Sequence, residues 1–180
     1  MNALLAFVNE SDFRVNHRLE GWRPPCWFRL WMIMATRLGD GWLWLPTGLV
    51  LLALGGRGLD VLGAAALAAA VANGLLIPLK RRFRRPRPCE REPNAYFVNP
   101  YRPQFRGDAF SFPSGHSLNA FAVCTVIALA FPSLAPLALL VAASIGASRV
   151  FLGLHFLTDV VVGAALGAAI GGSAFGVLVR

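Results

Sequence analysis

Charged residues are scarce in this chain, and several long stretches contain none. Asp, Glu, Lys and Arg make up 14% of the sequence, hydrophobic residues make up 56%, and the mean hydropathy is +0.57. A soluble domain is far less apolar. The chain does not begin with a basic segment, a short apolar core and a small-residue cleavage site, so we expect insertion to depend on internal apolar segments. The composition predicts an integral membrane protein with a single domain, residues 1–180.

Cysteine is also rare. Cys26, Cys89 and Cys124 match no metal-ligand spacing, and their odd number prevents complete pairing. Cys124 stands inside an apolar run, as a small core residue does. The sequence leaves open whether Cys26 and Cys89 pair. We therefore predict neither a metal centre nor a resident cofactor.

Uncharged runs predict the membrane spans. Gly41–Gly56 and Val61–Leu79 give two spans, joined by the tight connection Arg57–Asp60. Ser117–Ser148 would measure about 48 Å as one helix, which is too long for one crossing. Phe131-Pro132-Ser133 divides this run into a hairpin of two spans, and Val160–Val179 gives a fifth. Small residues that favour close helix packing recur every four positions in the fifth span, at Gly163, Gly167 and Gly171. The predicted fold class is all-α, a polytopic membrane helical bundle with five to six transmembrane helices.

The first 40 residues mix aromatic and Arg side chains, which suits a helix in the head-group region. We predict that residues 1–40 form an interfacial N-terminal segment. Within it, Cys26–Leu38 is short and contains Arg29, which favours an interfacial helix over a sixth, short span. Thr36–Gly41 then reads as a turn.

Positive charge is concentrated in one place. Nine of the 17 Lys and Arg residues fall between Lys80 and Arg106, within the one long polar loop, residues 80–112. Loops of this length usually carry function, and a basic loop beside a membrane favours a phosphate head group as partner. Nucleic acid is a poor candidate, because a lipid-embedded chain without a reader motif does not bind it.

The order of the spans gathers polar residues on one membrane face. The loop 80–112 joins the second and third spans, so both of its ends lie on the same face. The third and fourth spans form a hairpin, so the junction Ser148–Asp159 returns to that face. Arg149 and Asp159 are costly at the edge of a membrane core unless they are paired or functional, although Arg149 alone could be a snorkelling anchor.

Two histidines lie in this polar region. The stretch Phe112-Pro113-Ser114-Gly115-His116-Ser117 predicts a helix start with Ser as N-cap, where backbone N–H groups favour a bound anion and His116 can hold or deliver a proton. His155 and Asp159 are four residues apart, so on a helix they share a face. A carboxylate at one imidazole nitrogen fixes the tautomer and makes the other nitrogen a better nucleophile or base.

These residues together resemble the three-part signature of the type 2 phosphatidic acid phosphatase (PAP2) family. The signature is matched in order and spacing by Lys80 with Arg87-Pro88, by Pro113-Ser114-Gly115-His116, and by Ser148-Arg149 with His155 and Asp159. The resemblance covers residues 80–159; the remainder is similar only in being helical and apolar. It implies a helical bundle and a metal-independent phosphatase that acts on a membrane lipid phosphate or diphosphate.

The resemblance also implies a role for each residue. His155 would attack phosphorus and form a phosphohistidine, and Asp159 would orient it. His116 would protonate the leaving oxygen and then activate water. The phosphoryl oxygens would be bound by Lys80, Arg87, Ser114, Gly115 and Arg149. Phosphoryl transfer needs mainly alignment and charge neutralisation, which three cations and a helix N-terminus can supply.

The substrate and the membrane side follow only in outline. The family's range includes phosphatidylglycerophosphate, phosphatidic acid, undecaprenyl diphosphate and lipid A phosphate. The sequence ranks neither these lipids nor monophosphate against diphosphate, and it leaves the oligomeric state open. Counting Lys and Arg places the basic loop in the cytoplasm. Small bacterial relatives face the periplasm, and because the signature accounts for several of the cations, we expect a bacterial inner-membrane protein whose site faces the periplasm.

Two other functions remain as alternatives. Vanadium haloperoxidases share this site architecture, but they are soluble, and five apolar spans argue against such an oxidoreductase. A non-catalytic scaffold could recognise anionic lipid through the basic loop. Such a scaffold needs the cations but has no use for the His155–Asp159 pair.

Overall fold

The computed structural model describes residues 3–20, 22–88 and 110–179, and its regular elements there are helices. They are α1 (Ala3–Glu20), α2 (Cys26–Arg37), the π-helical turn η1 (Leu38–Trp42), α3 (Trp44–Leu54), α4 (Gly56–Phe83), α6 (Gly115–Ala130), the 3-10 turn η2 (Pro132–Leu134), α7 (Ala135–Phe151) and α8 (Leu157–Leu178).

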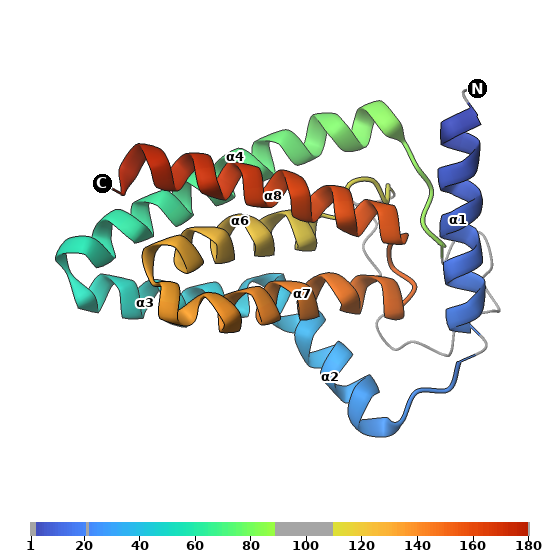
Figure 1. Cartoon of the computed structure of the whole chain (residues 1–180), viewed down its shortest axis with the longest axis horizontal. Helices are drawn as coiled ribbons and strands as arrows, with labels where there is room; N and C mark the ends of the chain where they lie inside the picture. Colours follow the sequence, from blue (N-terminus) through green and yellow to red (C-terminus); the bar gives the residue numbers. More distant parts are fainter. Residues whose placement is uncertain (1–2, 21, 89–109, 180) are drawn as a thin grey trace.

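Helix α6 occupies the centre of the bundle. It packs against α4, α7 and α8, and α3 packs along α4 (Figure 1). Its buried apolar residues belong to two clusters, one with α4 and α8 and the other with α7. The predicted hairpin is confirmed, because η2 begins at Pro132 and separates α6 from α7.

Three helices, α4, the η2–α7 segment and α8, are long and apolar enough to cross a membrane. Helices α3 and α6 are apolar but shorter. Large hydrophobic side chains point away from the bundle, among them Leu49, Ile77 and Val177, as lipid-facing residues do. The chain is a multi-pass membrane protein, and the predicted all-α membrane bundle is confirmed.

Three predicted boundaries are wrong. The chain turns at Gly55 and Gly56, both with positive φ, and the predicted connection Arg57–Asp60 lies inside α4. Lys80, predicted at the start of the loop, lies in the last turn of α4. The predicted turn Thr36–Gly41 starts too early: α2 continues to Arg37, and the chain bends at Gly41, whose φ of 115° is not helical. A polar residue at a helix end can face outward, so polarity alone did not locate these turns.

Helix α1 crosses the end of the bundle at a steep angle to the other helices, as a helix along the membrane surface would (Figure 1). The C-terminal ends of α4 and α7 and the N-terminal ends of α6 and α8 meet at this same end of the bundle. The polar residues of the predicted signature are therefore carried to one place. The single domain, residues 1–180, stays a prediction.

The glycines of α8 form the contact with α6. A Cβ at Gly163, Gly167 or Gly171 would lie 2.2–2.7 Å from the carbonyl oxygen of Ser114, Leu118 or Ala122 respectively. Only a residue without a side chain lets the two backbones approach this closely. The predicted small-residue face is thus confirmed.

We expect Gly167→Ala to lower the free energy of unfolding by about 1–3 kcal/mol, because the added methyl group would force α6 and α8 apart. The matched control is Gly172→Ala on the same helix, where nothing lies within 4 Å of the added Cβ. The stability of that variant should be unchanged or higher, since alanine is more favourable than glycine inside a helix. Thermal unfolding of both proteins in one detergent measures the difference, and equal stabilities would contradict the packing account.

Candidate active site

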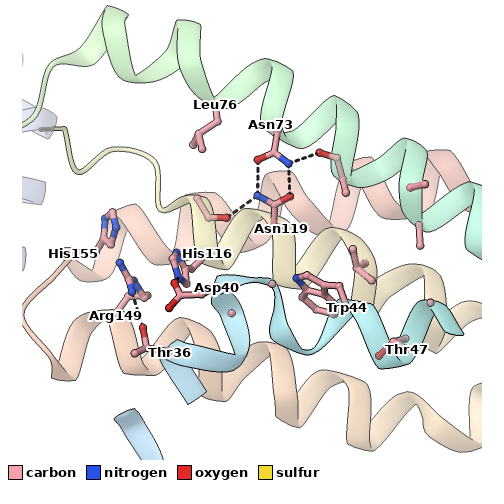
Figure 2. Close-up of a pocket in the computed structure, with 18 of the residues that line it drawn as sticks. Thr36, Asp40, Trp44, Thr47, Asn73, Leu76, His116, Asn119, Arg149 and His155 are labelled. Carbon is pink, nitrogen blue, oxygen red and sulfur yellow. Dashed lines mark hydrogen bonds and ion pairs between the residues drawn. The ribbon is translucent and has the colours of Figure 1, made fainter. Parts of the chain in front are cut away.

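A cavity of about 900 Å³ begins at the polar end of the bundle and continues between α3, α4 and α6. Its polar part is lined by Lys80, Arg87, His116, Arg149 and His155. Its apolar part is lined by Leu51, Leu62, Ala65, Ala69 and Val123. Figure 2 shows this order along the cavity, with His155, Arg149 and His116 towards one end and Thr47 towards the other. The shape suits a molecule with an anionic head and a hydrocarbon tail.

Three cations reach the cavity from three different segments. Lys80 lies in the last turn of α4, Arg149 in the last turn of α7, and Arg87 just beyond α4. All three are buried. The guanidinium of Arg87 donates to the carbonyl of Leu154 at 3.4 Å, and that of Arg149 donates to Thr36 Oγ1 at 2.6 Å. Thr36, at the end of α2, was not predicted as part of the site.

The loop between α7 and α8 places His155 beside Arg149. Gly153 turns the chain with a φ of 67°, and the backbone N–H groups of Leu154 and His155 both donate to the carbonyl of Arg149. The two residues are therefore held against the end of α7. His155 precedes α8 rather than lying on it, so the expectation that it shares a helix face with Asp159 is wrong in detail.

The His155–Asp159 pair forms nevertheless, because Asp159 sits in the first turn of α8. His155 Nδ1 lies 3.6 Å from Asp159 Oδ2, and the same oxygen accepts the backbone N–H of Phe156 at 2.9 Å. The pKa of His155 is lowered to about 3, mainly by burial. The contact with Asp159 raises this pKa, and the positive charges of Arg149 and Arg87 lower it further. The imidazole is consequently neutral at neutral pH, the form in which it can act as a nucleophile.

This lowered pKa gives a direct prediction. An ordinary histidine gains a proton as the pH falls through about 6.5. Because the pKa of His155 lies far below that value, we expect its ring to stay neutral from about pH 8 down to about pH 5. Histidine-selective nitrogen NMR of the purified protein measures this, with His155→Gln to assign the signal. Protonation near pH 6.5 would contradict the expected burial effect.

Asp159 has a second partner that the sequence did not single out. Arg85 donates to Asp159 Oδ1 at 2.7 Å and to Asp12 Oδ2 on α1 at 2.6 Å, and its guanidinium lies 4.1 Å from the ring centre of Phe156. Asp12 also accepts hydrogen bonds from the backbone N–H and the hydroxyl of Thr158. Helix α1 is thereby tied to the start of α8, and both oxygens of Asp159 are engaged.

His116 also has an aspartate partner. His116 Nε2 lies 2.7 Å from Asp40 Oδ1, which belongs to the π-helical turn η1. Gly39 lies against the same ring, so closely that a Cβ there would be 2.8 Å from His116 Cδ2. Asp40 was missed because it is 76 residues away in a segment that the sequence presented as a turn.

The start of α6 agrees with the prediction in part. Ser114 is the N-cap, and its hydroxyl oxygen accepts from the Ser117 hydroxyl at 3.1 Å and from the Ser117 N–H at 3.5 Å. Ser114 is fully buried and is not among the residues that line the cavity, whereas Gly115 and His116 are. Phosphate binding by Ser114 therefore stays a prediction.

Within the described ranges, no group of three or more His, Cys, Asp or Glu residues could hold a metal ion. Cys26 is exposed and Cys124 is buried as expected. Cys89 and most of the basic loop lie outside the described residues. The two ends of that loop are joined by Ser111. Its backbone N–H donates to the carbonyl of Arg85 at 2.8 Å, and its hydroxyl donates to the carbonyl of Pro86 at 3.2 Å.

Known proteins with similar sequences are phosphatases. The chain is 36% identical to a decaprenylphosphoryl-5-phosphoribose phosphatase of Mycobacterium tuberculosis over 132 residues, which is 73% of this chain and 68% of that protein. It is 41% identical to phosphatidylglycerophosphatase B of Bacillus subtilis over 78 residues, which is 37% of this chain. This second match spans only 38% of the Bacillus protein.

Two solved structures share the fold. One is a transmembrane PAP2-type phosphatidylglycerolphosphate phosphatase from Bacillus subtilis, with a TM-score of 0.70 at 28% identity, covering 94% of this chain and 85% of the other. The other is Aquifex aeolicus LpxE, with a TM-score of 0.71 at 25% identity, covering 91% and 94%. Residues 57–179 match the sequence profile of the PAP2 superfamily. The chain therefore belongs to the PAP2 superfamily, as a multi-pass membrane member related to lipid phosphatases.

Proposed function

We propose that the protein hydrolyses a phosphate or diphosphate monoester of a membrane lipid through a phosphohistidine intermediate. One observation carries the proposal: three buried cations and two histidines share the head of a cavity whose other end lies between apolar helices. The head suits a phosphoryl group, and the apolar end suits a lipid chain. Membership of the PAP2 superfamily supports the same reaction.

In the first step, His155 Nε2 attacks phosphorus and the bond between phosphorus and the lipid oxygen breaks. His116 gives its proton to the departing oxygen, so the lipid leaves as an alcohol or a monophosphate. In the second step, His116 takes a proton from water, and the resulting hydroxide attacks phosphorus. The bond between phosphorus and His155 Nε2 breaks, which frees the imidazole and releases inorganic phosphate. Lys80, Arg87 and Arg149 would neutralise the phosphoryl oxygens throughout, and Arg149 can do so with two parallel N–H groups.

Asp159 and Asp40 are positioning residues in this scheme. Asp159 faces Nδ1 of His155 and leaves Nε2 for the attack. Asp40 holds Nε2 of His116, so Nδ1 is the nitrogen left to carry the proton to the lipid oxygen. Each histidine would thus be oriented by its own carboxylate.

We expect Asp40→Asn to lower kcat about tenfold or more, because His116 loses a hydrogen bond to a charged group. The change should fall on kcat rather than on KM, and it should alter the dependence of kcat on pH, since the variant removes a charge beside the acid. Asp60→Asn, at an exposed position near the other end of α4, is the matched control. An unchanged pH profile with an unchanged kcat would remove Asp40 from the mechanism.

The proposed reaction needs no metal ion. Three cations at the cavity head can supply the charge that a metal would otherwise provide to the transferring phosphoryl group. Activity should therefore persist in EDTA.

The substrate class is a glycerophospholipid phosphate or an isoprenyl phosphate or diphosphate. The names of the relatives, a phosphatidylglycerophosphatase and a decaprenylphosphoryl-5-phosphoribose phosphatase, support both classes. Phosphate release by detergent-purified protein in EDTA tests the proposal. The substrates would be phosphatidylglycerophosphate, phosphatidic acid, undecaprenyl diphosphate and lipid A. Release from at least one lipid supports the function, and release only on adding a metal would overturn metal independence.

We also propose the bacterial inner membrane, with the site facing the periplasm. Lys and Arg residues usually mark the cytoplasmic side of a membrane protein. We give the cations at the cavity head little weight in that rule, because phosphate binding accounts for their presence. The end of α8 lies at the opposite end of the bundle from the site (Figure 1). A C-terminal green fluorescent protein should therefore fluoresce, and a C-terminal alkaline phosphatase should be inactive. The reverse pattern would place the site in the cytoplasm.

A further inference from the structure

Between the polar head of the cavity and its apolar end lies a pair of amide side chains that the proposed mechanism does not use. Asn73 on α4 and Asn119 on α6 both line the cavity. Asn119 follows His116 by three residues, which is about one helical turn. Figure 2 shows the two amides facing each other, with Asp40 and Trp44 on the segment that lies on the other side of His116 and Asn119.

The hydrogen bonds of this pair leave it with acceptors and no spare donors. Asn73 Nδ2 donates to the Ala69 carbonyl at 2.9 Å and to Asn119 Oδ1 at 3.2 Å. Asn119 Nδ2 donates to Asn73 Oδ1 at 3.0 Å and to the Gly115 carbonyl at 3.1 Å. All four amide N–H groups are thus used, whereas each side-chain oxygen accepts one hydrogen bond and can accept a second.

The pair is more than a bond between two helices. Helices α4 and α6 already meet through buried apolar residues, including Ala68, Ala72 and Leu118. The amides lie outside that contact: Asn73 is exposed and Asn119 is half-buried, both on the cavity wall. Asp40, another acceptor, lines the same cavity beside His116. A group that can donate hydrogen bonds would complete this set.

We infer that the Asn73–Asn119 pair binds a hydroxyl group on the part of the lipid that lies between the scissile phosphate and the hydrocarbon. The inference rests on the proposed function and specifies its substrate class: a lipid whose phosphate is carried by a polyol, such as glycerol or a sugar, with at least one free hydroxyl. A phosphate attached directly to a prenyl chain, or to a glycerol with both other oxygens esterified, offers no such donor. A second phosphate in a diphosphate adds only acceptors.

The test compares two lipids that differ in one hydroxyl. Phosphatidylglycerophosphate and its analogue without the central hydroxyl of the head-group glycerol, with identical acyl chains, are assayed with the purified full-length protein. The wild type should prefer the hydroxylated lipid in kcat/KM by about threefold to tenfold, as expected for one hydrogen bond. This comparison needs no variant, so it stands even if a substituted protein fails to fold.

A double variant then assigns the preference to the amides. Asn73→Leu with Asn119→Leu replaces both partners, so neither is left unpaired. In this protein the two lipids should have equal kcat/KM. Ser173→Ala removes an exposed hydroxyl from α8 that bonds only within its own helix, and that variant should keep the wild-type preference.

The outcomes separate the two proposals. Equal kcat/KM for the two lipids in the wild type overturns the inference while the phosphatase assignment stands. A preference that survives in the double variant also overturns it, because the hydroxyl is then read elsewhere. If the protein releases phosphate neither from these two lipids nor from any lipid of the wider panel, the proposed function is overturned and this inference with it.

Discussion

Replacement of His155 by alanine is expected to reduce phosphate release by at least about 10³-fold, because His155 is the nucleophile of the proposed mechanism and His116 acts as its acid and base. Lipid binding should change little, since Lys80, Arg87 and Arg149 remain. Steady-state phosphate release and the binding of a fluorescent substrate lipid measure the two properties separately. A loss of both together would indicate a misfolded protein, so His155→Asn, which retains more of the side-chain volume, provides a second variant.

His17→Ala is the matched control for this experiment. His17 lies on α1, is exposed, and is the one histidine of the sequence outside the cavity. Its replacement should leave phosphate release at the wild-type level. Near-normal turnover by the His155 variants would remove His155 from the nucleophilic role.

Replacement of Arg149 by lysine should lower kcat/KM by about 10²- to 10³-fold even though the charge is kept. Arg149 is buried at the cavity head and donates to Thr36 Oγ1 at 2.6 Å, which fixes its planar guanidinium. A lysine ammonium is a point charge and cannot form two parallel hydrogen bonds with phosphoryl oxygens. Steady-state kinetics on the preferred lipid measures the loss.

Arg81→Lys tests whether any arginine near the membrane surface behaves in this way. Arg81 is exposed in the last turn of α4, one residue from Lys80, and does not line the cavity. It should tolerate the change. Equal activity of the two lysine variants would mean that Arg149 acts only as an anchor at the membrane surface.

The order of the helices could be predicted because lipid imposes a simple rule on the chain. A stretch without charges must be helical in the bilayer, and Pro132 can only interrupt such a stretch. The boundaries were less predictable. The charges of Arg57 and Asp60 indicate a connection, yet both residues are exposed near the start of α4, where charged side chains are tolerated.

The candidate site could be predicted where its residues follow one another at fixed spacings. His155 and Asp159 meet even though His155 lies in a loop, because four residues also suffice to connect a loop to the first turn of a helix. Lys80, Arg87, His116 and Arg149 line one cavity, as the topological argument required.

The partners of these residues could not be predicted, because they come from distant parts of the chain. Asp40 reaches His116 only through the bend at Gly41 and the close approach of Gly39. Asp12 reaches Arg85 only because α1 crosses the end of the bundle. Neither aspartate belongs to a motif, and a single sequence carries no signal for a contact that tertiary packing alone creates.

The most direct test of the account is to trap the intermediate. The protein would be mixed with a lipid carrying radiolabelled phosphate, denatured within one turnover under alkaline conditions that preserve phosphohistidine, and digested for mass spectrometry. We predict label on the peptide containing His155, and no label when that residue is alanine. Turnover without a labelled protein, or label on a different residue, would contradict the central claim that His155 attacks the phosphate.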